Sequence, residues 1–189
     1  MGKWLERTLI VVVSLAVAIG VIALLSGGLA GSRDDPGVSG RSASGPGHQF
    51  RDQGDGQLAP GAAHPDYDSD PPTSGAHRPA PVTRNEASIS DDQLLQALAL
   101  GDVVFMYSTP KPPRGLRTIA DEVAPDFTPY LAAHGQTVIL ARRGGLPTIT
   151  ALAWTHMLRS NSAAALKEFA QYWLGRGAGT SVSRIVGNH

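Results

Sequence analysis

A long stretch without any charge dominates the amino-terminal part of the chain. It runs from Leu9 to Leu25 and stays weakly apolar to Ala30. Because an α-helix rises about 1.5 Å per residue, roughly 20 such residues cross the hydrocarbon core of a bilayer. Within lipid, the segment can satisfy its backbone hydrogen bonds only as a helix. The pattern therefore predicts a transmembrane helix over residues 9–30, preceded by a tip of residues 1–8.

The charges next to this helix predict its orientation. Lys3 and Arg7 precede it, and positive residues beside a span stay in the cytoplasm. We therefore expect the amino terminus in the cytoplasm, the rest of the chain outside, and the lipid bilayer as the first partner. A cleaved signal peptide is the alternative, because Gly28 and Ala30 are small residues where a signal peptidase could cut. Under either interpretation the rest of the chain lies outside the cytoplasm, and cleavage would make it a secreted protein.

Residues 31–61 have the composition of a flexible linker. They are rich in Gly, Ser, Asp and Pro and contain few large apolar residues. Such a segment buries too little surface to offset the entropy of ordering it. We expect a flexible linker here, then an extracytoplasmic domain over residues 62–176 and a flexible tail over residues 177–189.

Four helices, the third of them short, are predicted inside residues 62–176. Ser90 and Gln93 match a capping box, and the helix they begin ends before a glycine at position 101. Apolar residues at helical spacing predict a second helix around residues 116–123. Pro129 opens a short third helix, and Asn161 is the predicted N-cap of the last one.

Continuous apolar runs predict three strands, over residues 102–108, 136–141 and 148–156. The elements then follow one another as helix, strand, helix, strand, strand and helix. This order predicts an α/β fold, with a small mixed sheet of three or four strands against which the helices pack.

Composition and charge exclude several classes of function. The formal net charge is zero and the arginines are scattered, whereas nucleic-acid binding requires a basic face. The chain contains no cysteine, which excludes a disulfide, a thiolate metal site and a cysteine nucleophile. Nucleic acid is therefore not an expected partner.

Residues 64–79 contain most of the side chains that could bind a ligand or a metal ion. His64 and His77 are candidate ligands for a transition metal such as zinc or copper, because imidazole suits these ions. The alternative is a structural arm, in which aspartates cap turns and prolines stiffen the chain. Further binding candidates in the segment are Tyr67, Asp70, Thr73 and Ser74.

A calcium loop is a weaker interpretation of the same segment. Asp66, Asp68 and Asp70 alternate as the first three ligands of such a loop do. Pro71 stands where the loop needs glycine, and His77 stands where it needs a bidentate glutamate. These two departures disfavour calcium.

The same segment resembles a known family. His64-x-x-Tyr67 and Pro71-Pro72-Thr73-Ser74-Gly75-x-His77 are similar to the opening signature of the family of domain of unknown function 3105, whose members are often membrane-anchored bacterial proteins. The resemblance extends over residues 62–174. A second signature of that family, His-Ser-Leu-Glu-His-Gly, falls on residues 96–101 here.

The second signature is where this chain departs from the family. Gln96, Ala99 and Leu100 stand where the family has His, Glu and His. A site built from both signatures would keep at most His64 and His77. The sequence therefore assigns no catalytic residue and favours a non-catalytic binding module, with an envelope protein as the expected partner. The alternative is a transition-metal-binding domain that uses the two histidines.

Overall fold

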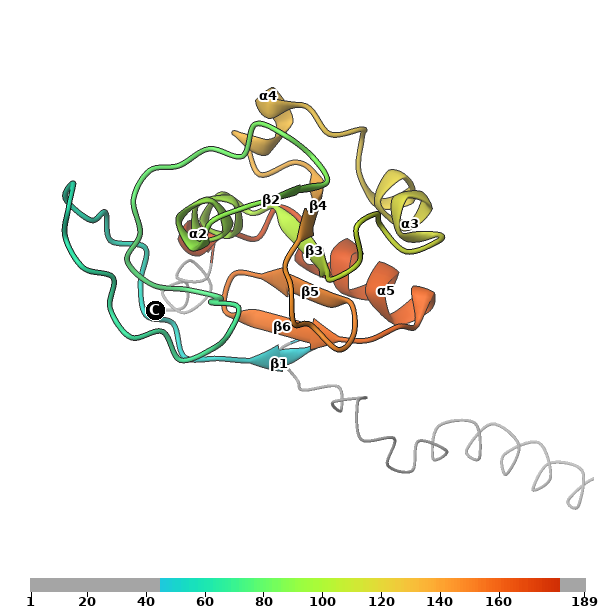
Figure 1. Cartoon of the computed structure of the whole chain (residues 1–189), viewed down its shortest axis with the longest axis horizontal. Helices are drawn as coiled ribbons and strands as arrows, with labels where there is room; N and C mark the ends of the chain where they lie inside the picture. The colour runs from blue at the N-terminus through green and yellow to red at the C-terminus, as the bar shows by residue number, and fades with distance from the viewer. Residues whose placement is uncertain (1–44, 181–189) are drawn as a thin grey trace, which may run out of the picture. The chain divides into compact units, whose positions relative to one another are not determined.

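The computed structural model describes residues 45–180. They form a mixed α/β domain with a six-stranded sheet in the order β1-β6-β5-β3-β4-β2 (Figure 1). The strands are β1 (His48–Gln49), β2 (Ala87–Ser88), β3 (Val103–Tyr107), β4 (Val138–Arg142), β5 (Thr150–Ala153) and β6 (His156–Arg159). The helices are α2 (Asp91–Leu100), α3 (Leu116–Val123), α4 (Pro129–Ala132) and α5 (Ala163–Trp173), followed by the 3-10 turn η1 (Ala178–Thr180).

The α/β class is confirmed, but the expected number of three or four strands is wrong. β3 lies at the centre, parallel to β4 and antiparallel to β5. The outer strands β1 and β2 contain two residues each and pair with β6 and β4. Two residues are too few to produce an apolar alternation, so a pattern of hydrophobic positions cannot reveal them.

The predicted strand over residues 148–156 is a hairpin of two strands, β5 and β6. The chain reverses at Thr155, whose φ is 60° and whose amide donates to the carbonyl of Thr73 over 2.9 Å. A positive φ is uncommon for a β-branched residue, and neither Gly nor Pro marks the turn. The buried side chains of Trp154 and His156 continue the apolar run through the reversal, which explains the error.

Local signals at the helix ends were more reliable. The capping box at the start of α2 is present, with Ser90 accepting from the amide of Gln93 over 3.2 Å. Gly101 ends the same helix with a φ of 110°. The last helix begins one residue later than expected, because Ser162 is its N-cap. Asn161 instead accepts a hydrogen bond from the amide of Ile149.

The sheet separates two apolar cores. All five residues of β3 are buried, and their side chains alternate between the two faces. Phe105 packs in the core that α3 and α5 cover, and Met106 packs in the core that α2 covers. Figure 1 shows α2 on one side of the sheet and α3 and α5 on the other. The two sides therefore present different surfaces.

Residues 45–50, which belong to the segment expected as a flexible linker over residues 31–61, contact the sheet and α5. β1 pairs with β6, and the amide of Phe50 donates to the carbonyl of Thr155 over 2.8 Å. The indole of Trp173 donates to the carbonyl of Pro46 over 2.8 Å. Gly47 lies so close to α5 that a Cβ there would be 2.7 Å from the ring of Phe169.

The other terminal predictions lie outside the described residues. These are the tip of residues 1–8, the helix over residues 9–30 and the tail beyond residue 180. Within residues 45–180, no helix has the length and apolar character needed to cross a membrane.

Candidate functional site

Residues 64–79, called the arm below, are ordered by pairing with the chain just before them. The amide of Gly75 donates to the carbonyl of Gly54, and the amide of His77 donates to that of Gly56. The amide of Leu58 donates in turn to the carbonyl of His77. These bonds measure 2.8 to 3.0 Å and form a short parallel pairing. The arm is therefore a fixed part of the domain.

Two of the predicted binding residues are inside the fold. Thr73 and Ser74 are fully buried. The hydroxyl of Ser74 donates to the carbonyl of Arg51 and accepts from the amide of Gln53, both over 3.1 Å. The carbonyl of Thr73 accepts from the turn between β5 and β6. Both residues connect the arm to the domain and are hidden from the surface.

His77 is also buried, with 3% of its surface exposed. Its Nδ1 lies 2.9 Å from the carbonyl oxygen of Gly75. A carbonyl oxygen can only accept, so Nδ1 is the donor of this hydrogen bond. The bond holds the imidazole ring in place.

His64 belongs to a charged cluster at the start of α2. Its Nε2 lies 2.8 Å from Oδ1 of Asp92 and 2.9 Å from Nη1 of Arg78. Asp92 also accepts from the amide of Arg78 over 2.8 Å and from its guanidinium over 3.2 Å. Burial alone would raise the pKa of Asp92, but the hydrogen bonds from Arg78 and His64 outweigh it and lower that pKa. The cluster attaches the arm to α2.

An open pocket lies between the arm and the start of α2, with a volume of about 470 Å³. Tyr67 lies at its wall, with its hydroxyl donating to the carbonyl of Ala76 over 2.9 Å. Burial raises the pKa of Tyr67, and the charges of Asp92 and Asp91 raise it further. The lining residues are His64, Pro65, Asp66, Tyr67, Ser69, Asp70, Pro72, Ser90, Asp91 and Asp92.

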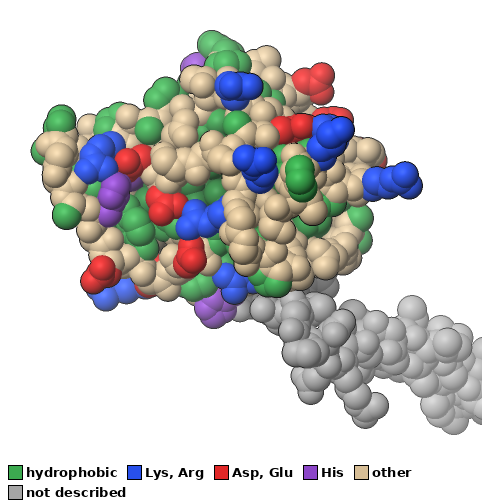
Figure 2. Space-filling view, in the orientation of Figure 1, with side chains coloured by type: hydrophobic (Ala, Val, Ile, Leu, Met, Phe, Trp, Pro, Cys, Tyr) green, Lys and Arg blue, Asp and Glu red, His purple; other side chains and the backbone are tan. Residues whose placement is uncertain are grey.

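Acidic groups outnumber basic ones around this pocket. Arg143 bridges two of its carboxylates, with 2.6 Å to Asp70 and 2.6 Å to Asp91. The side chain of Asp66 makes no hydrogen bond or ion pair within residues 45–180. Figure 2 shows acidic, basic and histidine side chains gathered at the left of the face it displays, where Figure 1 shows the arm.

The two predicted metal ligands have separate environments. Nε2 of His64 is in contact with the guanidinium of Arg78, and a bound cation would have to displace that positive group. His77 is buried and does not line the pocket. In the part of the chain that the structure describes, no group of three or more His, Asp or Glu residues is arranged to hold a metal ion. The structure therefore brings together His64, Tyr67 and Asp70 of the predicted set, but leaves out Thr73, Ser74 and His77.

Sequence reasoning missed the partners that come from outside the arm. Asp91 and Asp92 follow the N-cap Ser90, where acidic residues interact favourably with a helix dipole, and that role alone would explain them. Arg143 lies 73 positions after Asp70, so no local pattern connects the two.

The positions of the second signature continue from this pocket along α2. Gln96 follows Asp92 by four residues, which places both side chains on the same side of the helix. Ala99 is half-buried, and Leu100 is exposed at 40%. This chain therefore has an amide and two apolar side chains at these positions.

Comparisons with curated proteins and with solved structures found no significant match. A family model does match, over residues 62–181, and its description is "Protein of unknown function (DUF3105)". The match includes the arm, the pocket and most of the sheet, and it confirms the resemblance seen in the sequence. The chain therefore belongs to the DUF3105 family of proteins of unknown function.

Proposed function

We propose that this protein is a membrane-anchored binding module whose domain lies outside the cytoplasm. The support for the anchor is the uncharged run over residues 9–25, and the support for the orientation is Lys3 and Arg7 before it. The domain uses the pocket between the arm and α2 to bind a basic segment of an envelope protein.

The observation that favours this function is the excess of carboxylates at a preformed open pocket. Four aspartates line it, and within residues 45–180 the guanidiniums that form ion pairs with them are those of Arg143 and Arg78. Tyr67 adds an aromatic wall, on which the stem or charge of a lysine or arginine side chain can pack. Acidic pockets of this kind complement a positive partner and speed its association.

The arm supports binding more strongly than chemistry. The hydroxyl of Ser74 and the Nδ1 proton of His77 are both committed to backbone carbonyls, where they hold the arm in place. The metal-binding alternative with His64 and His77 has less support, because the guanidinium of Arg78 lies 2.9 Å from Nε2 of His64, where a metal ion would bind.

Peptide binding tests the proposal. The whole protein in detergent micelles is titrated into fluorescent peptides that are identical except for lysine, glutamine or glutamate at two positions, and anisotropy is recorded. We expect the lysine peptide to bind most tightly, with an affinity that falls as salt is added. Asp66→Asn should weaken that binding roughly two- to fivefold, the range of a partly exposed charge contact.

Asp68→Asn is the matched control. Asp68 lies two positions from Asp66, is exposed and carries the same charge, but does not line the pocket. Equal losses in both variants would show a non-specific charge effect and would contradict the proposed site. A lack of preference for the lysine peptide would contradict the proposed partner.

A further inference from the structure

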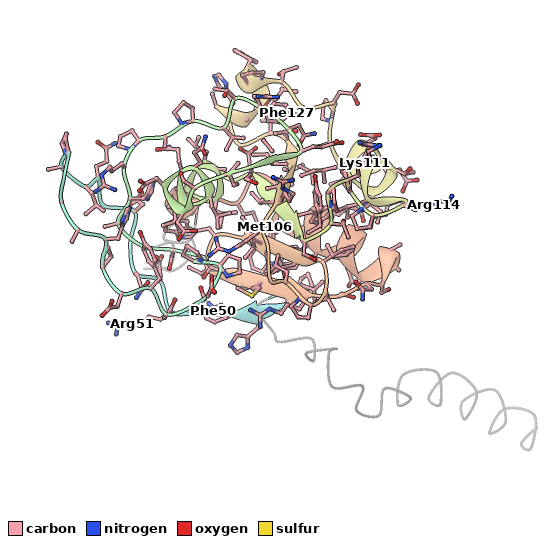
Figure 3. All side chains as sticks on the ribbon, in the orientation of Figure 1. Phe50, Arg51, Met106, Lys111, Arg114 and Phe127 are labelled. Carbon is pink, nitrogen blue, oxygen red and sulfur yellow. The ribbon has the colours of Figure 1, made fainter. Side chains whose placement is uncertain are left out.

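Residues 45–50, called the strap below, pass over α5 and then along the outer edge of the sheet. β1 lies beside β6 at this edge, and Phe50 follows it (Figures 1 and 3). The amide of Phe50 donates to the carbonyl of Thr155 over 2.8 Å, and the carbonyl of Pro46 accepts from the indole of Trp173 over 2.8 Å. Hydrogen bonds near both ends thus hold the strap on the domain.

A buried histidine lies next to the strap. His156 belongs to β6 and pairs with Gln49 of β1, and 4% of its surface is exposed. Its ring stacks on that of Trp173, with 3.7 Å between the ring centroids, and the same indole donates to Pro46. His156 therefore lies where the strap, β6 and α5 meet.

The charged form of His156 is poorly accommodated in the described fold. An imidazolium carries a proton on each ring nitrogen. Nδ1 lies 3.0 Å from the carbonyl oxygen of Trp154 and can donate to it. Nε2 is buried and has no hydrogen-bond partner within residues 45–180. Protonation in the closed fold would therefore leave a positive N–H buried and unsatisfied, which costs free energy.

The charges around His156 also oppose a positive ring. Burial, and after it the charge of His48 on β1, lower the pKa of His156, and the hydrogen bond to Trp154 opposes them only in part. On the side of α5, the guanidinium of Arg176 lies 5.9 Å from the ring centroid of Trp173. The aromatic face that would attract an imidazolium thus already has a cation beside it.

The other elements around His156 do not compensate a positive charge. β5, the inner neighbour of β6, contains no titratable residue. The charged residues of α5 are Lys167 and Glu168, which lie on other sides of the helix from Trp173. A proton on His156 is therefore accommodated best when the strap moves away and water reaches the ring.

We propose that the strap is a pH-sensitive closure, held on the domain at neutral pH and released in acid when His156 takes up a proton. The uncharged ring fits between β1 and Trp173, whereas the charged ring is more favourable in water. Release frees the edge of β6 and the indole of Trp173. It also adds the strap to the length of chain that precedes the domain.

The sign of the effect follows from the two states of the strap. In the released state His156 is exposed and has its usual pKa of about 6.5, whereas the closed state lowers that pKa. The closed state is therefore fully stable above the pKa of the released form, and this stability is lost as pH falls through the pKa of the closed form. One proton changes the opening equilibrium by at most about tenfold per pH unit.

Hydrogen exchange measures the opening of the strap. The whole protein in detergent micelles is labelled between about pH 7.5 and about pH 5, and each rate is corrected for the pH dependence of an unstructured chain. A peptide with the amide of Phe50 reports the strap, and a peptide with β3 reports global unfolding.

We expect the opening constant of the strap to rise as pH falls, by at most about tenfold per pH unit, while β3 stays protected. Constant protection of the strap across this range, or an equal loss of protection in the strap and in β3, would overturn the proposal.

Two histidine variants locate the proton. His156→Phe keeps a ring that can stack on Trp173 but cannot ionise, and the carbonyl of Trp154 still accepts from the hydroxyl of Thr155 over 2.7 Å. Protection of the strap should then be independent of pH. His48→Gln is the matched control, because it removes a titratable ring from the strap itself and leaves the buried ring. A pH response that persists in His156→Phe, or disappears in His48→Gln, would contradict the role of His156.

Gly47→Ala separates release of the strap from protonation. Gly47 has a φ of 95°, and a Cβ there would lie 2.7 Å from the ring of Phe169. This variant should expose the amide of Phe50 to exchange already at neutral pH. If its strap stays closed at neutral pH and opens in acid as in the unaltered protein, residues 45–50 are not the moving part. His156→Gln is a second variant that cannot ionise, and it should match His156→Phe.

Discussion

Asp102 connects the stability of the domain to pH in a direction that can be measured. It lies between α2 and β3 with 1% of its surface exposed. Its Oδ1 accepts from the amide of Thr137 over 3.0 Å, and its Oδ2 has no partner within residues 45–180. Burial raises the pKa of this carboxyl from 3.8 to about 7, and the single hydrogen bond from Thr137 only partly opposes that shift.

The sign of the effect follows from the two states of Asp102. Between pH 4 and pH 7 the folded protein holds a proton that the unfolded chain has released. The stabilisation is therefore complete below the unfolded pKa and is lost as pH rises through the folded pKa. One proton changes the free energy of unfolding by about 1.4 kcal/mol per pH unit, so the loss across this range is roughly 4 kcal/mol. That is a large part of the ~5–15 kcal/mol by which domains are stable.

Asp102→Asn isolates this contribution. The amide keeps the shape of the side chain and an oxygen that accepts from Thr137, but it cannot ionise. We expect similar stability for the two proteins at pH 4 and a more stable variant at pH 8, by up to about 4 kcal/mol.

Urea unfolding of the whole chain in detergent measures the difference. The fluorescence of Trp154 and Trp173, which are both buried, follows the transition at each pH. Subtracting one protein from the other removes the titration of every other group. A difference that stays constant from pH 4 to pH 8 would refute the idea that Asp102 titrates within this range.

Three other predictions use different parts of the chain. Gly135→Ala should destabilise the domain by at least ~2 kcal/mol in thermal unfolding, because a Cβ there would lie 2.0 Å from the carbonyl oxygen of Leu100 at a φ of 64°. Gly144→Ala, which meets nothing within 4 Å, should change stability by less than about 1 kcal/mol. Calorimetric titration with zinc and copper should show no submicromolar binding, whereas tight binding lost in both His64→Ala and His77→Ala would restore the metal alternative. A reporter active only outside the cytoplasm and fused after the last residue should be active, and an inactive fusion would reverse the proposed orientation.

Elements encoded by neighbouring residues were predictable from the sequence. The capping box of α2 needs only Ser90 and Gln93, and β3 needs only its own run of apolar residues. The two-residue strands β1 and β2 were not predictable, because their pairing depends on β6 and β4, which follow much later in the chain. The reversal at Thr155 was not predicted for a related reason, since the amide of Thr155 donates its hydrogen bond to the carbonyl of Thr73 in the arm.

The candidate site divides in the same way. The arm could be identified from its residue types, and His64, Tyr67 and Asp70 do line one pocket. The interior positions of Thr73, Ser74 and His77 could not be foreseen, because they depend on hydrogen bonds between the arm and backbone groups elsewhere in the chain. A further pocket, lined by residues of α3, β4 and the segments before β2 and after α3, had no signal in the sequence.

The short strand β1 has a consequence for how the domain can be isolated. The family match begins at residue 62, but β1 and the contacts of Pro46 and Phe50 lie before it. A fragment trimmed to the matched region would lose the strand that covers β6 and the carbonyl that receives the Trp173 indole proton. An uncovered strand edge is a template for pairing between molecules. We therefore expect a fragment that begins at the family boundary to self-associate more than one that keeps residues 45–61.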